Sequence, residues 1–94
     1  MNNTVSTRKG LIKIQNKFGL HARAAIKLTT LASRYTTRIS LTHNGRSIDA
    51  KDIMAVLALG AKKGTELELI TEGEDYEEAF RAIEELFNAC FDEE

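Results

Sequence analysis

Residues 19–25 read Gly19-Leu20-His21-Ala22-Arg23-Ala24-Ala25, and the apolar side chains after them recur at helical spacing. Positions three and four residues apart form one face of an amphipathic helix. The spacing predicts a helix from near Ala22 to about Ser33, with His21 at its N-cap or directly beside it. The apolar stripe consists of Leu28, Leu31, Ala32 and Tyr35.

A histidine at a helix start faces an anion site. The first amide N–H groups of a helix lack internal partners and carry the positive end of the helix dipole, an arrangement that binds phosphate well. The candidate backbone donors are those of Ala22, Arg23 and Ala24, and the Arg23 guanidinium adds a planar cationic donor. The simpler alternative is that His21 is a solvated surface residue or an ordinary cap.

The composition describes one small globular domain. The 94 residues are 43% hydrophobic and 29% charged, which supports a single modest core over residues 1–94. No apolar run is long enough to cross a membrane, and the N-terminus has no hydrophobic signal core. We expect residues 1–8 to form a flexible extension and the single Cys90 to pack in the core of a cytoplasmic protein.

Charge is distributed unevenly along the chain. Residues 1–48 contain nine basic side chains and no acidic one, whereas residues 64–94 contain twelve acidic side chains and only Arg81 as a basic one. This asymmetry indicates a basic face for an acidic partner, or two halves that attract each other in the fold. The basic half has only Phe18 and Tyr35 as aromatic residues, which disfavours nucleic-acid binding.

The remaining segments alternate between strand and helix patterns. An Asn-Gly turn within residues 43–46 joins two short strands, and Asp52 offers an N-cap to a short helix that Gly60 closes. The order β-α-β-β-α-β-α predicts an α+β, two-layer open-faced sandwich in which three helices cover one face of a four-stranded antiparallel sheet. The expected strands are 10–15, 38–42, 47–49 and 65–71, and the expected later helices are 53–59 and 75–90.

Cofactor and metal chemistry lack a basis in this sequence. His21, His43 and Cys90 do not form a set with metal-ligand spacing. The chain also lacks a glycine-rich nucleotide loop and a paired-carboxylate site. We therefore expect neither a metal nor a cofactor, and we read His43 as a solvated turn residue.

Several motifs together resemble one family. The chain is similar to HPr proteins, the histidine phosphocarriers of the bacterial phosphoenolpyruvate phosphotransferase system, from about Lys9 onward. The C-terminal residues 86–94 and Lys27 resemble the nitrogen-branch members, known as NPr. The matching segments are residues 19–25, 44–45, 50–54, 59–64 and 72–75.

The resemblance implies a relay function. His21 would accept a phosphoryl group on Nδ1 from phosphorylated Enzyme I of the nitrogen type and pass it to a histidine of an EIIA-type protein. Arg23 and the helix amides would stabilise the phosphoryl charge. A regulatory module whose His21 phosphorylation state controls an effector protein is the alternative, and a basic nucleic-acid module is a third.

The short helix at 53–59 is apolar all round. Seven consecutive apolar residues cannot all face one core, so some are expected to stay exposed near His21 as a docking patch. The resemblance implies docking through this helix and the first one. The candidate docking residues are Leu20, Lys27, Ile53, Met54 and Leu57, and each apolar one has core packing as its alternative.

Two positions depart from the family pattern. Ala24 stands where the family usually has proline, which predicts a looser turn with phosphotransfer retained. Asp52 stands at a position where many HPr proteins carry a regulatory serine. Aspartate cannot be phosphorylated by a serine kinase, so we expect that control to be absent and Asp52 to serve as a helix cap.

Overall fold

A computed structural model describes residues 6–93 of the chain. Helices and strands alternate in the expected order and then end in a short helical turn. The strands are β1 (Thr7–Lys13), β2 (Arg38–His43), β3 (Arg46–Asp49) and β4 (Glu66–Glu72). The helices are α1 (Ala22–Ala32), α2 (Ile53–Leu59), α3 (Tyr76–Asn88) and the one-turn η1 (Cys90–Asp92).

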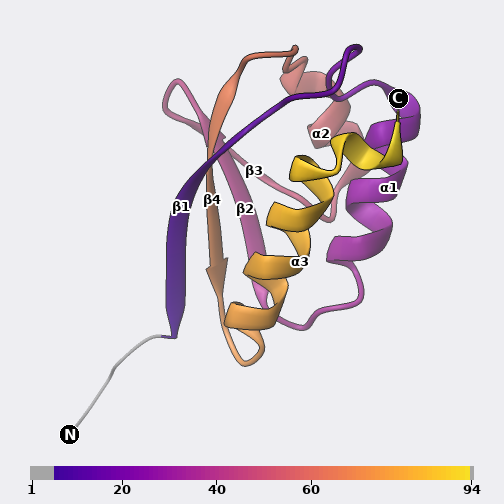
Figure 1. The fold of residues 1–94 in the computed structure, drawn as a ribbon. Helices are drawn as coiled ribbons and strands as arrows, with labels where there is room; N and C mark the ends of the chain where they lie inside the picture. Colours follow the sequence, from indigo (N-terminus) through magenta and orange to yellow (C-terminus); the bar gives the residue numbers. More distant parts are fainter. Residues whose placement is uncertain (1–5, 94) are drawn as a thin grey trace, which may run out of the picture.

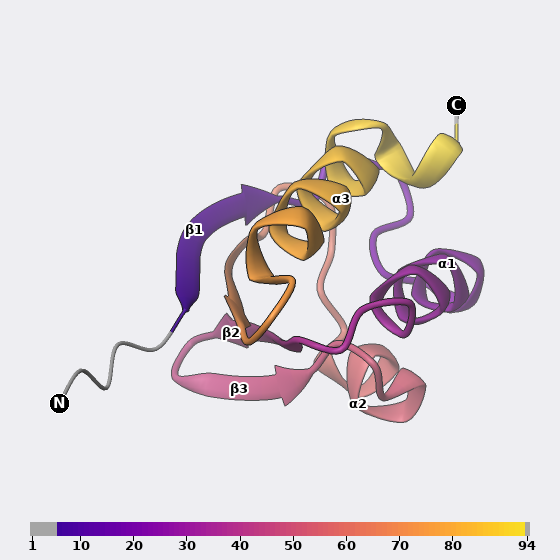
Figure 2. The same ribbon diagram turned by 90° about the horizontal axis from the view of Figure 1, so that it is seen from below.

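The strands form one antiparallel sheet in the order β1-β4-β2-β3. All three helices lie on the same face of this sheet, and the other face is left open (Figure 1). The view from below separates the two layers, with α3 over β1 and β4 and with α2 near β3 (Figure 2). This confirms the predicted open-faced α+β sandwich.

Alternation along the central strands supplies the sheet side of the core. Every second side chain of β4 is buried, as are Ile39 and Leu41 on β2. Helix α3 covers this surface with Phe80, Ile83 and Phe87, which recur at helical spacing and are almost fully buried.

None of the helices in the described part of the chain is long and apolar enough to span a bilayer.

Local signals fixed the ends of α2 as predicted. The Asp52 carboxylate accepts hydrogen bonds from the amides of Met54 at 3.1 Å and Ala55 at 3.3 Å. Gly60 ends the helix in a left-handed conformation with φ of 61°. The cap satisfies two of the amides that a helix start leaves unpaired.

The chain's N-terminal part differs from the expectation. Strand β1 begins at Thr7, so Thr7 and Arg8 belong to the sheet and not to an extension; residues 1–5 lie outside the described residues. Both residues pair with β4, and the Arg8 guanidinium lies over the Phe80 ring and 2.7 Å from Glu77. Partners from the distant C-terminal half extend the strand, which an N-terminal sequence pattern cannot reveal.

The last helix is shorter than predicted. Helix α3 ends at Asn88, and residues 90–92 follow in a left-handed turn with φ between 54° and 60°. The turn buries Phe91 against Phe87 with ring centroids 4.8 Å apart, while Cys90 stays only half-buried. The prediction that Cys90 packs in the core on a helix reaching residue 90 was therefore wrong, because Phe91 takes that place.

Because Phe91 is fully buried, we expect its side chain to contribute to the stability of the fold. Replacement of this fully buried side chain by alanine should lower the free energy of unfolding by about 3 kcal/mol, because it leaves a cavity between the C-terminal turn and α3. Phe18→Ala is the matched control, since Phe18 is 69% exposed and its loss should change stability by less than about 0.5 kcal/mol. Chemical denaturation of the two variants tests this, and equal effects would contradict the assignment of Phe91 to the core.

Candidate functional site

His21 is the N-cap of α1. Its backbone is extended, with φ of −75° and ψ of −179°, and its carbonyl accepts the first helical hydrogen bond from the Ala25 amide at 2.8 Å. The ring Nδ1 accepts a hydrogen bond from the Arg23 amide at 3.2 Å. The predicted position of this imidazole against the unpaired amides of a helix start is confirmed.

A tight approach between two loops places this N-cap. Gly19 has φ of 65°, and a Cβ there would lie 2.5 Å from the Ala61 carbonyl oxygen, so only glycine fits. The next amide, that of Leu20, donates to the same carbonyl at 3.0 Å. The turn directs the chain into α1 with the His21 ring outside the core.

Glu93 lies on the other side of the ring. Its Oε2 is 2.6 Å from His21 Nε2, although 72 residues separate the two in sequence. The side chains are only partly exposed, 29% for His21 and 13% for Glu93. The C-terminal turn runs beside the start of α1, which makes this contact possible (Figure 1).

Two further side chains hold the C-terminal turn in place. Asn16, which is 1% exposed, donates through Nδ2 to the Gly19 carbonyl at 2.7 Å and to Glu93 Oε1 at 3.1 Å. Lys27 donates to the Phe91 carbonyl at 2.7 Å. Asn16 and Glu93 were not among the site residues predicted from the sequence, because nothing local marks a buried asparagine or a C-terminal glutamate as a neighbour of His21.

The environment keeps the Glu93 carboxyl ionised. Burial acts to raise its pKa, but hydrogen bonds from Asn16 and His21 and the positive charge of Lys27 outweigh burial and hold the pKa below its ordinary value of 4.5. A carboxylate in this state is a strong hydrogen-bond acceptor and cannot donate.

Cations and an aromatic ring surround the open side of His21. A hollow of about 590 Å³ has the imidazole and the Glu93 carboxylate in its wall. Phe18 meets the imidazole edge to face at 6.0 Å between ring centroids. The other lining residues are Lys17, Arg23, Lys27 and Asp92. The three basic side chains outnumber the two carboxylates, those of Asp92 and Glu93, and they lie beside a helix N-terminus, which favours an oxyanion there.

The predicted docking residues divide between surface and core. Met54 is 71% exposed, whereas Ile53 and Leu57 are partly buried and pack against the core. Leu20 is only 4% exposed, so its assignment to the docking surface was wrong. The turn at Gly19 directs the Leu20 side chain into the core and leaves His21 outside it. Ile26 on α1 is also 52% exposed, and the sequence pattern did not single it out because it lies off the apolar stripe.

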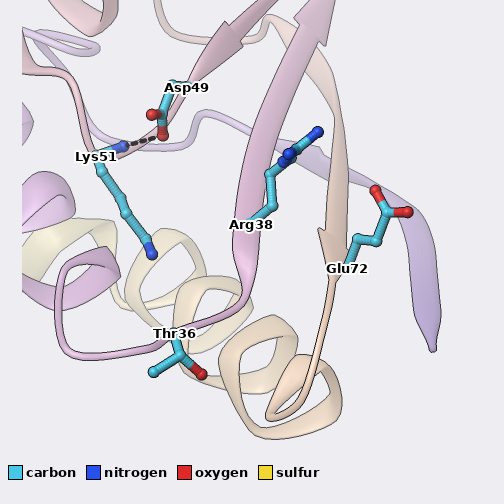
Figure 3. A pocket seen from close by; sticks show the side chains of 5 residues that line it. All are labelled: Thr36, Arg38, Asp49, Lys51 and Glu72. Carbon is cyan, nitrogen blue, oxygen red and sulfur yellow. Dashed lines mark hydrogen bonds between the residues drawn. The ribbon is translucent and has the colours of Figure 1, made fainter. Parts of the chain in front are cut away.

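A second hollow, of about 540 Å³, lies at one end of the sheet (Figure 3). Arg38 and Glu72 project from neighbouring strands, and the Lys51 amide is bonded to the Asp49 carboxylate at 2.9 Å. Thr36 completes the lining. The charges of the two acidic and the two basic side chains in this hollow nearly cancel. This hollow contains neither a histidine nor a cysteine, and residues 6–93 bring no group of three metal-ligating side chains together.

Comparisons with known proteins agree with the observed fold. The family profile described as "PTS HPr component phosphorylation site" matches residues 9–89. The chain belongs to the HPr family, the phosphocarrier proteins of the phosphotransferase system.

Relatives cover nearly the whole chain. The phosphocarrier protein HPr of Pseudomonas aeruginosa is 52% identical over 83 residues, 87% of this chain and 92% of that protein. That of Neisseria meningitidis serogroup A is 45% identical over 85 residues, 90% of this chain and 96% of that protein. The crystal structure of HPr from Thermoanaerobacter tengcongensis superimposes with a TM-score of 0.90 at 37% identity, covering 93% of this chain and 98% of that one.

The lowered pKa of Glu93 predicts an acid-sensitive C-terminal turn. A folded-state pKa below the unfolded value means that the contact stabilises the fold fully above about pH 4.5 and loses its contribution as pH falls through the lowered pKa. NMR titration should show the Glu93 side chain and the Phe91 amide shifting together below pH 4.5.

The pKa of Asp75 is also lowered, because burial, which acts to raise it, is outweighed by hydrogen bonds from Thr37 and Thr36. Global stability would therefore report on both carboxyl groups, and the measurement must follow Glu93 by itself. In Glu93→Gln the coupled shift of the Phe91 amide should vanish while the Asp75 titration remains. A Glu93 midpoint above 4.5 would contradict the prediction.

Proposed function

We propose that His21 Nδ1 accepts a phosphoryl group from phosphorylated Enzyme I and passes it to a histidine of an EIIA-type protein in the cytoplasm. The observation that supports this most is the position of Nδ1 at the N-terminus of α1, directly beside the Arg23 amide. The basic side chains around the hollow, those of Lys17, Arg23 and Lys27, add attraction for the phosphoryl oxygens.

In the transfer step, the Nδ1 lone pair attacks phosphorus while the bond from phosphorus to the donor's nitrogen breaks. The amide that donates to Nδ1 in the resting protein then becomes a donor to a phosphoryl oxygen, together with the neighbouring amides of residues 22–24 and the exposed Arg23 guanidinium. Positioning and electrostatics supply most of the catalysis in such a reaction. An open site binds the group weakly enough for it to be released to the acceptor.

The nitrogen branch of the system is the proposed context. Support comes from Lys27 and the C-terminal residues 86–94, whose resemblance is to that branch. These two features touch in the fold, since Lys27 donates to the Phe91 carbonyl. The donor would then be the nitrogen-type Enzyme I.

Two positions give this chain its own properties within the family. Asp52 has no hydroxyl to phosphorylate and already caps α2, so control by a serine kinase is absent. Ala24 occupies the first turn of α1 with a fully buried side chain. We expect phosphoryl transfer to be retained without the usual proline.

Labelling tests the proposed acceptor. With phosphoenolpyruvate and nitrogen-type Enzyme I, the wild-type protein should gain one acid-labile phosphoryl group, whereas His21→Ala should gain none because the nucleophile is missing. His43→Ala is the control and should be labelled like the wild type. Label on His21→Ala would contradict the assignment.

The acceptor step separates the alternatives. Added EIIA-type protein should remove the label from the carrier. Label that forms but never moves would favour a regulatory module controlled by His21. Faster labelling by the sugar-branch Enzyme I would contradict the nitrogen-branch assignment.

Docking through the exposed apolar side chains gives a separate prediction. Met54→Gln should lower kcat/KM for transfer about five- to tenfold, because burial of a methionine at an interface contributes roughly 1.5–3 kcal/mol and glutamine recovers only part of it. Leu11→Gln is the matched control: Leu11 is 67% exposed on the open face of the sheet, away from His21. Equal kinetics for both variants in steady-state transfer assays would rule out a docking role for Met54.

A further inference from the structure

The hydrogen bonds around His21 specify where its ring proton lies. Nδ1 accepts a hydrogen bond from the Arg23 amide, so this nitrogen carries a lone pair and no proton. The contact of 2.6 Å between Nε2 and Glu93 Oε2 therefore has Nε2–H as the donor and the carboxylate as the acceptor. The resting ring is the neutral tautomer protonated on Nε2.

Glu93 is itself held rigidly. Its second oxygen accepts the Asn16 amide at 3.1 Å, and Asn16 is almost completely buried. The turn that carries Glu93 is anchored by the buried Phe91 ring and by the bond from Lys27 to the Phe91 carbonyl. The carboxylate is thus in place before any partner protein docks.

We infer that Glu93 is a positioning residue for phosphoryl transfer: its carboxylate fixes the orientation and tautomer of His21 so that the Nδ1 lone pair faces the incoming phosphorus. The inference rests on the proposed role of His21 as the acceptor. A carboxylate bonded to the far nitrogen of a catalytic histidine serves the same purpose in hydrolase triads.

The carboxylate also acts on the charge that develops during the step. The Nδ1 lone pair forms the new bond to phosphorus, and the pair of the breaking bond leaves with the donor's nitrogen. The Nε2 proton stays on the ring, which gains positive charge as the new bond forms. Glu93 lies next to that proton and stabilises the charge, both in acceptance and in the reverse step of donation.

The alternative is a purely structural role, in which Glu93 only fastens the end of the chain. The two roles differ in one observable, the protonation pattern of the two ring nitrogens. The test therefore compares Glu93→Ala and Glu93→Gln with the wild type. Glu85→Ala removes an exposed carboxylate from α3 and serves as a control for the change in net charge.

The first measurement is ¹⁵N NMR of the His21 imidazole at pH 8, without any donor protein. The wild type and Glu85→Ala should show Nε2 protonated and Nδ1 unprotonated. Glu93→Ala should show averaged shifts from two tautomers, and Glu93→Gln should keep the wild-type pattern because its amide oxygen still accepts the bond. A wild-type pattern in Glu93→Ala overturns the inference.

The second measurement is the single-turnover rate of phosphorylation by Enzyme I. Glu93→Ala should be slower by about tenfold, which corresponds to ~1.4 kcal/mol, and Glu93→Gln should fall between it and the wild type because it orients the ring without the charge. An altered ring pattern with an unchanged rate overturns the inference, and so does a slower rate with an unaltered ring pattern. Absence of labelling on the wild type, with the ring pattern as expected, would instead contradict the proposed function.

Discussion

The His21 imidazole is held between the first turn of its own helix and the last turn of the chain. One ring nitrogen accepts a hydrogen bond from a backbone amide of α1, and the other is hydrogen-bonded to the Glu93 carboxylate. Each contact alone is a common hydrogen bond. Together they leave a single nitrogen lone pair at the positive end of a helix, which is the requirement of a phosphoryl acceptor.

This arrangement connects the surroundings of His21 to the hydrophobic core. Phe91 is buried beside Phe87, and its backbone carbonyl accepts a hydrogen bond from the Lys27 side chain of α1. Three consecutive non-glycine residues with positive φ are costly for L-amino acids, so burial and hydrogen bonding must offset their strain. The same packing that stabilises the end of the chain therefore sets the position of the carboxylate beside His21.

The site nevertheless remains accessible. His21 lies on the surface above a wide hollow lined by basic side chains, and Met54 and Ile26 leave apolar surface on the two neighbouring helices. A carrier that gives its phosphoryl group to another protein needs this combination. A fully enclosed site would retain the phosphoryl group. An open site with exposed apolar side chains beside it lets a partner protein dock and supply the rest of the site.

Local patterns determined most of the fold. The apolar periodicity of α1, the Asp52 cap and Gly60 end of α2, and the Asn-Gly turn each depend on residues only a few positions apart, so all were predicted from the sequence. The position of His21 at a helix start follows from the same information. Charge asymmetry along the chain also anticipated contacts between its halves, of which Arg8 with Glu77 is one.

Only the tertiary structure decided the features that join distant segments. Strand β1 begins at Thr7 because β4 pairs with it, and Leu20 is buried because the Gly19 turn approaches Ala61. Glu93 meets His21 across 72 residues, after a left-handed turn that no helical periodicity encodes. Sequence spacing records which side chains share a face of one element, but not which elements fold against each other.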